Sequence, residues 1–219
     1  MDEKGQKTIV FVCTGNTCRS PMAEALMRAE IRRLRWTDVV ATSAGVGVRT
    51  ESDLNEKSAR VLSDNGLTLP NFKSKKMTVD LLERAFLILC MTDDQRDFLR
   101  QAQMRLHGET KLNTVFSYRD ITGSEIPDPY GQDLAAYQKT YEALAAATPL
   151  ILERFFGVKE DEPTVPIEEK TLLLVETKPK RKAPSKRKPS QKQTEQKTTK
   201  KRSPQTGNRK KKNEKEKTK

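Results

Sequence analysis

A cysteine and an arginine, separated by five residues, lie between an apolar run and a helix-start signal near the beginning of the chain. The segment reads Cys13-Thr14-Gly15-Asn16-Thr17-Cys18-Arg19-Ser20-Pro21. This spacing alone is common by chance, but its position between a buried strand and a helix N-terminus is not. The backbone N–H groups of such a turn converge and the helix dipole points the same way, so the position predicts an anion-binding site.

Cys13 and Arg19 supply side chains that covalent phosphoryl chemistry needs at such a site. A guanidinium is planar and always charged, and it can hold two phosphoryl oxygens at once. The positive surroundings favour the thiolate of Cys13, which is the nucleophilic form of the side chain. The simpler interpretations are a small buried residue at a strand end for Cys13 and a surface ion pair for Arg19.

An Asp-Pro pair lies far along the sequence. Asp128 opens the run Asp128-Pro129-Tyr130-Gly131. A leaving atom must receive a proton and a water must later lose one, and a single Asp side chain can serve both steps. Taken alone, Asp-Pro most often forms a turn.

The elements that position these residues alternate between strands and helices. Apolar, β-branched stretches predict four strands, at 8–12, 38–43, 85–91 and within 113–118. Apolar residues at helical spacing predict one helix with Ser20 as N-cap and Pro21 as first residue, and others at 54–65, 93–106 and 134–156. This alternation predicts an α/β fold, a four-stranded parallel doubly wound sheet with helices on both faces. The Cys13–Ser20 turn then follows the carboxyl end of the first strand, where such sheets hold active sites.

Charge divides the chain into two unlike parts. The 219 residues include 42 Lys and Arg and 30 Asp and Glu. Of these, 19 basic and 3 acidic residues fall within 178–219, which gives that stretch a net charge of +16 and residues 1–177 a net charge of −4. The basic stretch has no Val, Ile, Leu, Met, Phe, Trp, Tyr or Cys to bury, so we expect it to be disordered. The expected organisation is a folded domain at 1–157, a linker at 158–177 and a Lys/Arg-rich tail at 178–219.

Three cysteines in a chain of this size do not suggest a disulfide framework and fit a reducing compartment. The apolar run Thr8–Val12 is too short for a signal-peptide core or a membrane span. These features predict a soluble cytoplasmic protein. The predicted chemistry needs neither a metal nor a cofactor.

The order of these motifs resembles that of the low-molecular-weight protein phosphatases. The stretch VFVCTGNTCRSPMAEAL looks like the signature of that family. The likeness covers roughly residues 7–156 and continues at Ser43-Ala44-Gly45, Cys90-Met91-Thr92 and Asp128-Pro129-Tyr130-Gly131. It implies that residues 1–157 are a phosphatase domain acting on phosphorylated proteins through a phosphocysteine intermediate.

The resemblance also implies a role for each motif residue. Cys13 would be the nucleophile, Arg19 the phosphate clamp, and Asp128 the general acid and then the general base. Asn16 and Ser43 would shape the loop, Ser20 would stabilise the thiolate, and Tyr130 would form a wall of the cleft. The phosphate cradle would comprise Thr14, Gly15, Asn16, Thr17, Cys18 and Ser20.

One position departs from the family pattern, and one pair of cysteines suggests regulation. Many members have a His before the Ser of the segment that corresponds to Phe72–Lys75, and this chain has Phe72 there. Its single His, His107, lies at a predicted helix end far from the motifs and is expected at the surface. Four residues separate Cys13 from Cys18, and a reactive thiolate with a neighbouring resolving cysteine predicts a reversible disulfide on oxidation.

Position 17 separates the possible substrates. Tyrosine phosphatases of the family usually carry a branched aliphatic residue there, often Ile, whereas bacterial protein-arginine phosphatases carry Thr, as this chain does in Thr17. A Thr hydroxyl can hydrogen-bond a planar guanidino group, and Asp128 can add a charge-assisted bond. Phosphoarginine is therefore the favoured substrate and phosphotyrosine the second. Arsenate reductases with a similar loop need a further cysteine pair, and Cys90 has no partner near it in the sequence.

The basic stretch admits a different class of function. Residues 178–219 contain the clusters KPKRK, SKRKPS, KKR and NRKKKNEKEK with no aromatic residue between them. This pattern predicts salt-sensitive electrostatic binding to nucleic acid or another polyanion, without base stacking. The alternatives are a solvated tail without function, and a protein whose phosphatase fold serves only as a docking module. The intact Cys13, Arg19 and Asp128 argue against the docking module, and no pattern defines an oligomeric state.

Overall fold

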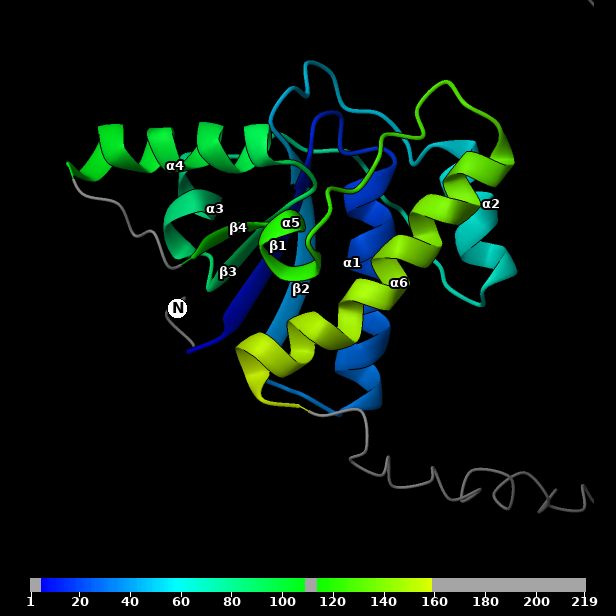
Figure 1. The fold of residues 1–219 in the computed structure, drawn as a ribbon, viewed down its shortest axis with the longest axis horizontal. Coiled ribbons are helices and arrows are strands. Elements are labelled where there is room, and N and C mark those ends of the chain that lie inside the picture. The colour runs from blue at the N-terminus through cyan, green and yellow to red at the C-terminus, as the bar shows by residue number, and fades with distance from the viewer. Residues whose placement is uncertain (1–4, 109–113, 159–219) are drawn as a thin grey trace, which may run out of the picture. The chain divides into compact units, whose positions relative to one another are not determined.

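The computed structural model describes residues 5–108 and 114–158. Four parallel strands form one sheet in the order β2-β1-β3-β4 (Figure 1). Their bounds are β1 (Lys7–Cys13), β2 (Val39–Gly45), β3 (Leu87–Cys90) and β4 (Val115–Ser117). The predicted four-stranded parallel sheet is confirmed. Because β2 pairs with one side of β1 and β3 with the other, strand order reverses beside β1, which places a binding crevice at its carboxyl end.

The helices cover both faces of this sheet. They are α1 (Arg19–Arg33), α2 (Glu56–Asp64), α3 (Val79–Arg84), α4 (Asp93–His107), α5 (Arg119–Thr122) and α6 (Leu134–Phe156). Figure 1 shows α1 and α6 on one side of the sheet and α3 and α4 on the other. The alternation of side chains along β1 explains this: Ile9 and Phe11 join the core under α1 and α6, whereas Val10 and Val12 join the core under α3 and α4.

The start of α1 differs from the prediction. The helix begins at Arg19, and its cap residue is Cys18, whose side chain makes no capping hydrogen bond. Ser20 lies inside the first turn, and its hydroxyl contacts the Cys13 thiol instead of a helix N–H group. The prediction of Ser20 as N-cap was therefore wrong, because buried polar groups of the preceding loop compete for the same hydroxyl.

The end of β2 also differs from the prediction, which stopped the strand at Ser43. The strand continues to Gly45 because its pairing with β1 runs as far as Cys13, which lies opposite Gly45. A segment remote in sequence adds a bridge there: Gly45 N–H donates to Lys75 O, and Met77 N–H donates to Gly45 O. A Cβ at Gly45 would lie 2.5 Å from Thr14 O. Glycine therefore allows the turn after β1 to pack directly on the end of β2.

Other boundaries differ by a residue or two, and two short helices were not predicted. Strand β3 is shorter than the predicted 85–91, and α2 is shorter than the predicted 54–65 because the Asn55 side chain caps it. The unpredicted helices are α3, capped by the Thr78 side chain, and α5. The long helix α6 has the predicted bounds and ends at Gly157, where φ is +72°.

Some predictions concern residues that the structure does not describe. The basic tail at 178–219, its expected disorder, and the linker after Val158 lie outside the described residues. His107 is the last residue of α4, as expected of a helix end. Within 5–108 and 114–158, the helices are too short or too polar to cross a membrane.

Candidate active site

The turn after β1 holds Cys13 almost completely buried, with 3% of its surface exposed. The Asn16 backbone N–H donates to Cys13 Sγ at 3.2 Å, and Ser20 Oγ lies 3.0 Å from the same sulfur. The N–H groups of Gly15, Thr17 and Cys18 bond to no other described residue. The turn therefore combines a sulfur that has donors around it with further backbone donors that an anion can use.

Asn16 holds the shape of this turn. Its φ of 53° lies in the left-handed region, which Asn tolerates better than most residues. Its fully buried side chain donates to Ser20 Oγ at 3.0 Å and to Ser43 Oγ at 2.8 Å. The side-chain oxygen of Asn16, Oδ1, accepts from the Lys75 backbone N–H at 2.8 Å. Support for the loop thus comes from the backbone of the Phe72–Lys75 segment.

Arg19 and Asp128 meet although 108 residues separate them in sequence. Arg19 is 5% exposed, and its Nη2 lies 2.6 Å from Asp128 Oδ2. Its Nη1 donates to Ile126 O at 3.3 Å, and its buried Nε has no partner among the described residues. The Asp128 side chain is 51% exposed, and its Oδ1 accepts from the Tyr130 N–H at 3.2 Å. A buried cation and a solvent-accessible carboxylate therefore face each other beside the turn.

These groups line one cleft of about 450 Å³. Its wall includes the turn, the segment after β2, and the loop before α6, and consists of Cys13, Thr14, Gly15, Thr17, Cys18, Arg19, Gly47, Val48, Arg49, Thr50, Ser52, Asp128 and Tyr130. Tyr130 is 71% exposed at its rim. Of the predicted site residues, only Asn16, Ser20 and Ser43 do not line the cleft. Their side chains are buried and form the hydrogen bonds that support the turn.

Sequence reasoning missed Gln95, which supports the turn from α4. Gln95 is 6% exposed; its Oε1 accepts from the Met91 N–H at 3.1 Å, and its Nε2 donates to Thr14 Oγ1 at 3.2 Å. Thr92, the cap residue of α4, precedes it by three positions. A Thr followed three residues later by Gln is the pattern of a capping box, so this signal was present in the sequence.

The three cysteines are free thiols with different surroundings. Cys90 is fully buried in β3, and burial raises the pKa of its thiol, which keeps it protonated and unreactive. Cys18 Sγ lies 3.5 Å from the Tyr137 hydroxyl, and burial together with this contact raises the pKa of Tyr137. The Cys13–Cys18 disulfide remains a prediction.

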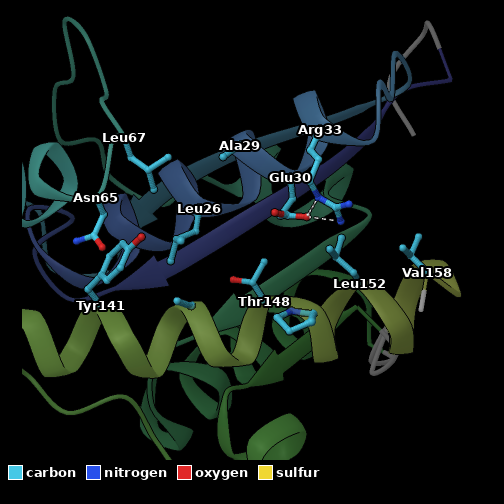
Figure 2. Close-up of a pocket in the computed structure, with 12 residues that line it drawn as sticks. Leu26, Ala29, Glu30, Arg33, Asn65, Leu67, Tyr141, Thr148, Leu152 and Val158 are labelled. Atoms are coloured by element: carbon cyan, nitrogen blue, oxygen red, sulfur yellow. Dashed lines mark hydrogen bonds and ion pairs between the residues drawn. The ribbon is translucent and has the colours of Figure 1, made fainter. Parts of the chain in front are cut away.

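A larger cavity, of about 560 Å³, lies between α1 and α6 (Figure 2). Its lining is mainly apolar, and Figure 2 shows Leu26, Leu67 and Leu152 around it together with the Glu30–Arg33 ion pair. None of the cysteines lines it, so it offers no nucleophile beside an acid. Convergence of reactive groups, and not volume, identifies the cleft at the turn after β1 as the candidate site.

Comparison with known proteins shows the family of the chain. The family profile described as "Low molecular weight phosphotyrosine protein phosphatase" matches residues 8–160. The chain belongs to this family. Its members include both kinds of phosphatase that the sequence suggested. The family is cysteine-based, which makes this chain a cysteine-dependent protein phosphatase.

Three relatives show the range of the family. The protein-arginine-phosphatase of Bacillus subtilis (strain 168) is 35% identical over 138 residues, covering 62% of this chain and 88% of that protein. The probable low-molecular-weight protein-tyrosine-phosphatase EpsP of Ralstonia nicotianae is 30% identical over 138 residues, covering 63% and 88%. A solved structure of the YwlE arginine phosphatase, a Cys-to-Ser mutant with a phosphorylated active-site serine, matches with a TM-score of 0.58 and 31% identity, covering 67% of this chain and 96% of that one. Family membership alone does not choose between arginine and tyrosine substrates.

Proposed function

We propose that this protein hydrolyses phosphoarginine in proteins through a phosphocysteine intermediate. The observation that carries the proposal is the position of Thr17, whose partly buried side chain lines the cleft with Cys13 and Asp128. A hydroxyl at this wall can hydrogen-bond a planar guanidino group, and the carboxyl group of Asp128, which lines the same cleft, can hydrogen-bond it as well. The 35% identity to an arginine phosphatase supports the same choice.

In the first step, the Cys13 thiolate attacks phosphorus, and an S–P bond forms as the P–N bond to the guanidino group breaks. The electron pair of the broken bond goes to nitrogen, which receives the proton of Asp128. Arg19 and the backbone N–H groups of the turn hold the phosphoryl oxygens. Since Arg19 bonds Asp128 at 2.6 Å, phosphoryl oxygens compete with Asp128 for the guanidinium and release the carboxyl group toward the leaving nitrogen.

In the second step, Asp128, now a carboxylate, takes a proton from water as the water oxygen attacks phosphorus. The S–P bond breaks, and inorganic phosphate and the Cys13 thiolate are released. Ser20 Oγ, 3.0 Å from Cys13 Sγ, stabilises the thiolate both as nucleophile and as leaving group.

Phosphotyrosine is the second candidate substrate, and Tyr130 is the observation that favours it. This ring is 71% exposed, and it lines the cleft together with the apolar side chain of Val48. The two side chains can contact an aryl ring, and the pair of that ring with Tyr130 gains energy beyond simple burial. A direct comparison of rates on phosphoarginine and phosphotyrosine peptides of the same sequence separates the two substrates.

Replacement of Thr17 by Ile should shift the preference from phosphoarginine toward phosphotyrosine. The change removes a hydrogen bond worth about 0.5–1.5 kcal/mol and leaves a polar leaving group unpaired at a further cost of about 1–3 kcal/mol. The ratio of kcat/KM for the two peptides should therefore change by about tenfold or more, since about 1.4 kcal/mol corresponds to one decade. The added apolar bulk suits an aryl ring.

Thr50→Ile is the matched control for this substitution. Thr50 lines the same cleft from the segment after β2. Its replacement by Ile therefore adds the same bulk without changing the turn that carries Cys13. Its peptide ratio should stay close to that of the wild type. An unchanged ratio in Thr17→Ile would show that Thr17 does not read the substrate and would remove the main support for phosphoarginine.

We also propose that the basic stretch at 178–219 binds polyanions such as RNA. We propose further that the protein is cytoplasmic, since its free thiols fit a reducing compartment.

Deletion of 178–219 should leave the rate on a small aryl phosphate nearly unchanged and remove most binding to poly(U) at low salt. Filter binding over a salt series and a chromogenic assay measure the two effects. Loss of turnover on truncation would contradict this division of roles, and absence of turnover in both forms would favour a docking module.

A further inference from the structure

The cavity of about 560 Å³ between α1 and α6, called the α1–α6 groove below, leaves apolar side chains partly exposed. Leu26 and Leu67 in its wall are only half-buried. Figure 2 shows Leu67 and Tyr141 at one end of the groove, and Arg33, Leu152 and Val158 at the other. Apolar surface that stays open in this way marks a place where another segment or molecule packs.

The chain itself returns to this groove after α6. The helix ends at Gly157, where φ is +72°, and the Val158 N–H then donates to Leu152 O at 3.3 Å. Leu152 and Val158 both line the groove. The chain therefore continues from a residue in the wall of the groove. A segment attached at such a point has an effective concentration on the order of millimolar, so even weak docking is well populated.

The residues that follow are first acidic, and the nearby end of the groove is basic. Glu160, Asp161 and Glu162 form a continuous acidic run. Arg33 lines the groove beside the end of α6, and Arg32 precedes it in the last turn of α1 (Figure 2). Glu30 pairs with Arg33 at 2.7 Å, which leaves one positive charge in excess. Complementary charge therefore favours the acidic run at this end of the groove.

An apolar strip comes next in the sequence. Pro163, Val165 and Ile167 alternate with Thr164 and Pro166. Successive side chains of an extended chain point to opposite sides, so the first three share one side. The two prolines restrict the backbone before docking, which lowers the entropy lost when the segment is held in one conformation. The order of the segment, acidic and then apolar, matches the order of the groove from its basic end inward.

The length of the segment fits the length of the groove. Along α6, the distance from Leu152 to Tyr141 is about 17 Å at about 1.5 Å per residue. The chain from Val158 to Ile167 can span up to about 30 Å at about 3.3 Å per residue. Ile167 can therefore reach the far end of the groove. The other apolar run, Leu172–Val175, follows later in the sequence, so it could fill the groove only if the preceding residues looped out.

We propose that residues 160–167 dock in the α1–α6 groove, with Pro163, Val165 and Ile167 against its apolar walls and the acidic run beside Arg33. The folded domain then ends at Ile167 and includes part of the predicted linker. Neither Cys13, Arg19 nor Asp128 lines the groove, so the docking does not depend on the proposed phosphatase chemistry.

A thiol introduced by Ala145→Cys reports whether the groove is covered. Ala145 lies on α6, lines the groove and is partly buried. In the 219-residue chain, iodoacetamide should alkylate this thiol about tenfold more slowly than in the same chain carrying Val165→Asp and Ile167→Asp, because charges oppose burial against apolar walls. A tenfold difference corresponds to a groove covered about nine-tenths of the time. The tryptic peptide that contains position 145 has no natural cysteine, so mass mapping follows this thiol alone.

Two controls separate docking from general effects. Ala146→Cys places a thiol at the next position of α6, which is exposed and outside the groove. Its alkylation rate should be the same with and without Val165→Asp and Ile167→Asp. Leu172→Asp combined with Leu174→Asp adds the same charge to the later apolar run, and it should leave the protection of the thiol at position 145 intact.

Reversal of the acidic run tests the charge contribution separately. Glu160→Lys combined with Glu162→Lys should weaken the protection of the thiol at position 145 at low salt, because these lysines face the basic end of the groove. The weakening should diminish at high salt, since salt screens exposed charges. Glu168→Lys combined with Glu169→Lys is the matched control, because these positions follow the docked residues, and it should change the protection little.

Three results would overturn the proposal. The first is equal alkylation of Ala145→Cys with and without Val165→Asp and Ile167→Asp. The second is loss of protection with Leu172→Asp and Leu174→Asp, which would assign the groove to the later run. The third is protection that grows with protein concentration, which would assign it to a second copy of the chain. If Ala145→Cys does not fold, Ala29→Cys on the facing wall of α1 repeats the test.

Discussion

Replacement of Cys13 by Ser should abolish turnover while leaving the binding of phosphate analogues intact. A serine hydroxyl stays protonated at neutral pH, so the variant loses its nucleophile, and kcat should fall by at least about a thousandfold. The backbone donors of the turn and the Arg19 guanidinium remain, so vanadate or phosphate should still bind. The measurements are turnover of a chromogenic aryl phosphate and of a phosphoarginine peptide, with binding followed by calorimetry.

Cys90→Ala is the matched control for this variant. Cys90 is also a buried cysteine, but burial raises the pKa of its thiol, and it lies in β3 away from the cleft. Its removal should leave turnover close to the wild-type rate. Activity of Cys13→Ser within about tenfold of the wild type would refute the assignment, since loss of a covalent nucleophile costs far more.

Replacement of Arg19 by Lys should lower kcat/KM by about a hundredfold to a thousandfold, the range seen when one preorganised donor to a reacting oxyanion is lost. Lysine keeps the charge but not the planar fork that holds two oxygens. It also loses the two bonds that the guanidinium makes to Asp128 Oδ2 and Ile126 O. Binding of phosphate should weaken in the same variant, which Cys13→Ser should not show.

Arg119→Lys serves as the control for the loss of a guanidinium. Arg119 is 54% exposed and pairs with Asp93 and Glu125, near the cleft but outside it. Its replacement should change kcat/KM little, because exposed ion pairs contribute little and can be remade by lysine. Equal losses in the two variants would show that general charge near the cleft matters more than the fork of Arg19.

The sequence alone was sufficient for the features that depend on neighbours along the chain. The run of β-branched residues before Cys13 favours a buried strand, and the turn that follows joins it to a helix, so the positions of Cys13 and Arg19 relative to β1 and α1 are local properties. The alternation of strands and helices likewise predicted the parallel sheet, because each strand must be covered on both faces. The bounds of α6 followed from its apolar spacing and the glycine after it.

Only the tertiary structure decided which distant groups meet. Nothing in the spacing of Arg19 and Asp128 indicates a 2.6 Å contact, because that contact depends on how the loop before α6 returns to the end of β1. Ser20 is of a residue type that often caps helices. Its hydroxyl is buried beside Asn16 and Cys13, however, and contacts these two groups instead of a helix N–H group. Glu24 has an evident partner in Arg28, four residues further along α1, but the contact of its other oxygen with Ser43 of β2 depends on how α1 packs on the sheet. Local patterns fix the elements, whereas buried polar contacts depend on the packing of several elements at once.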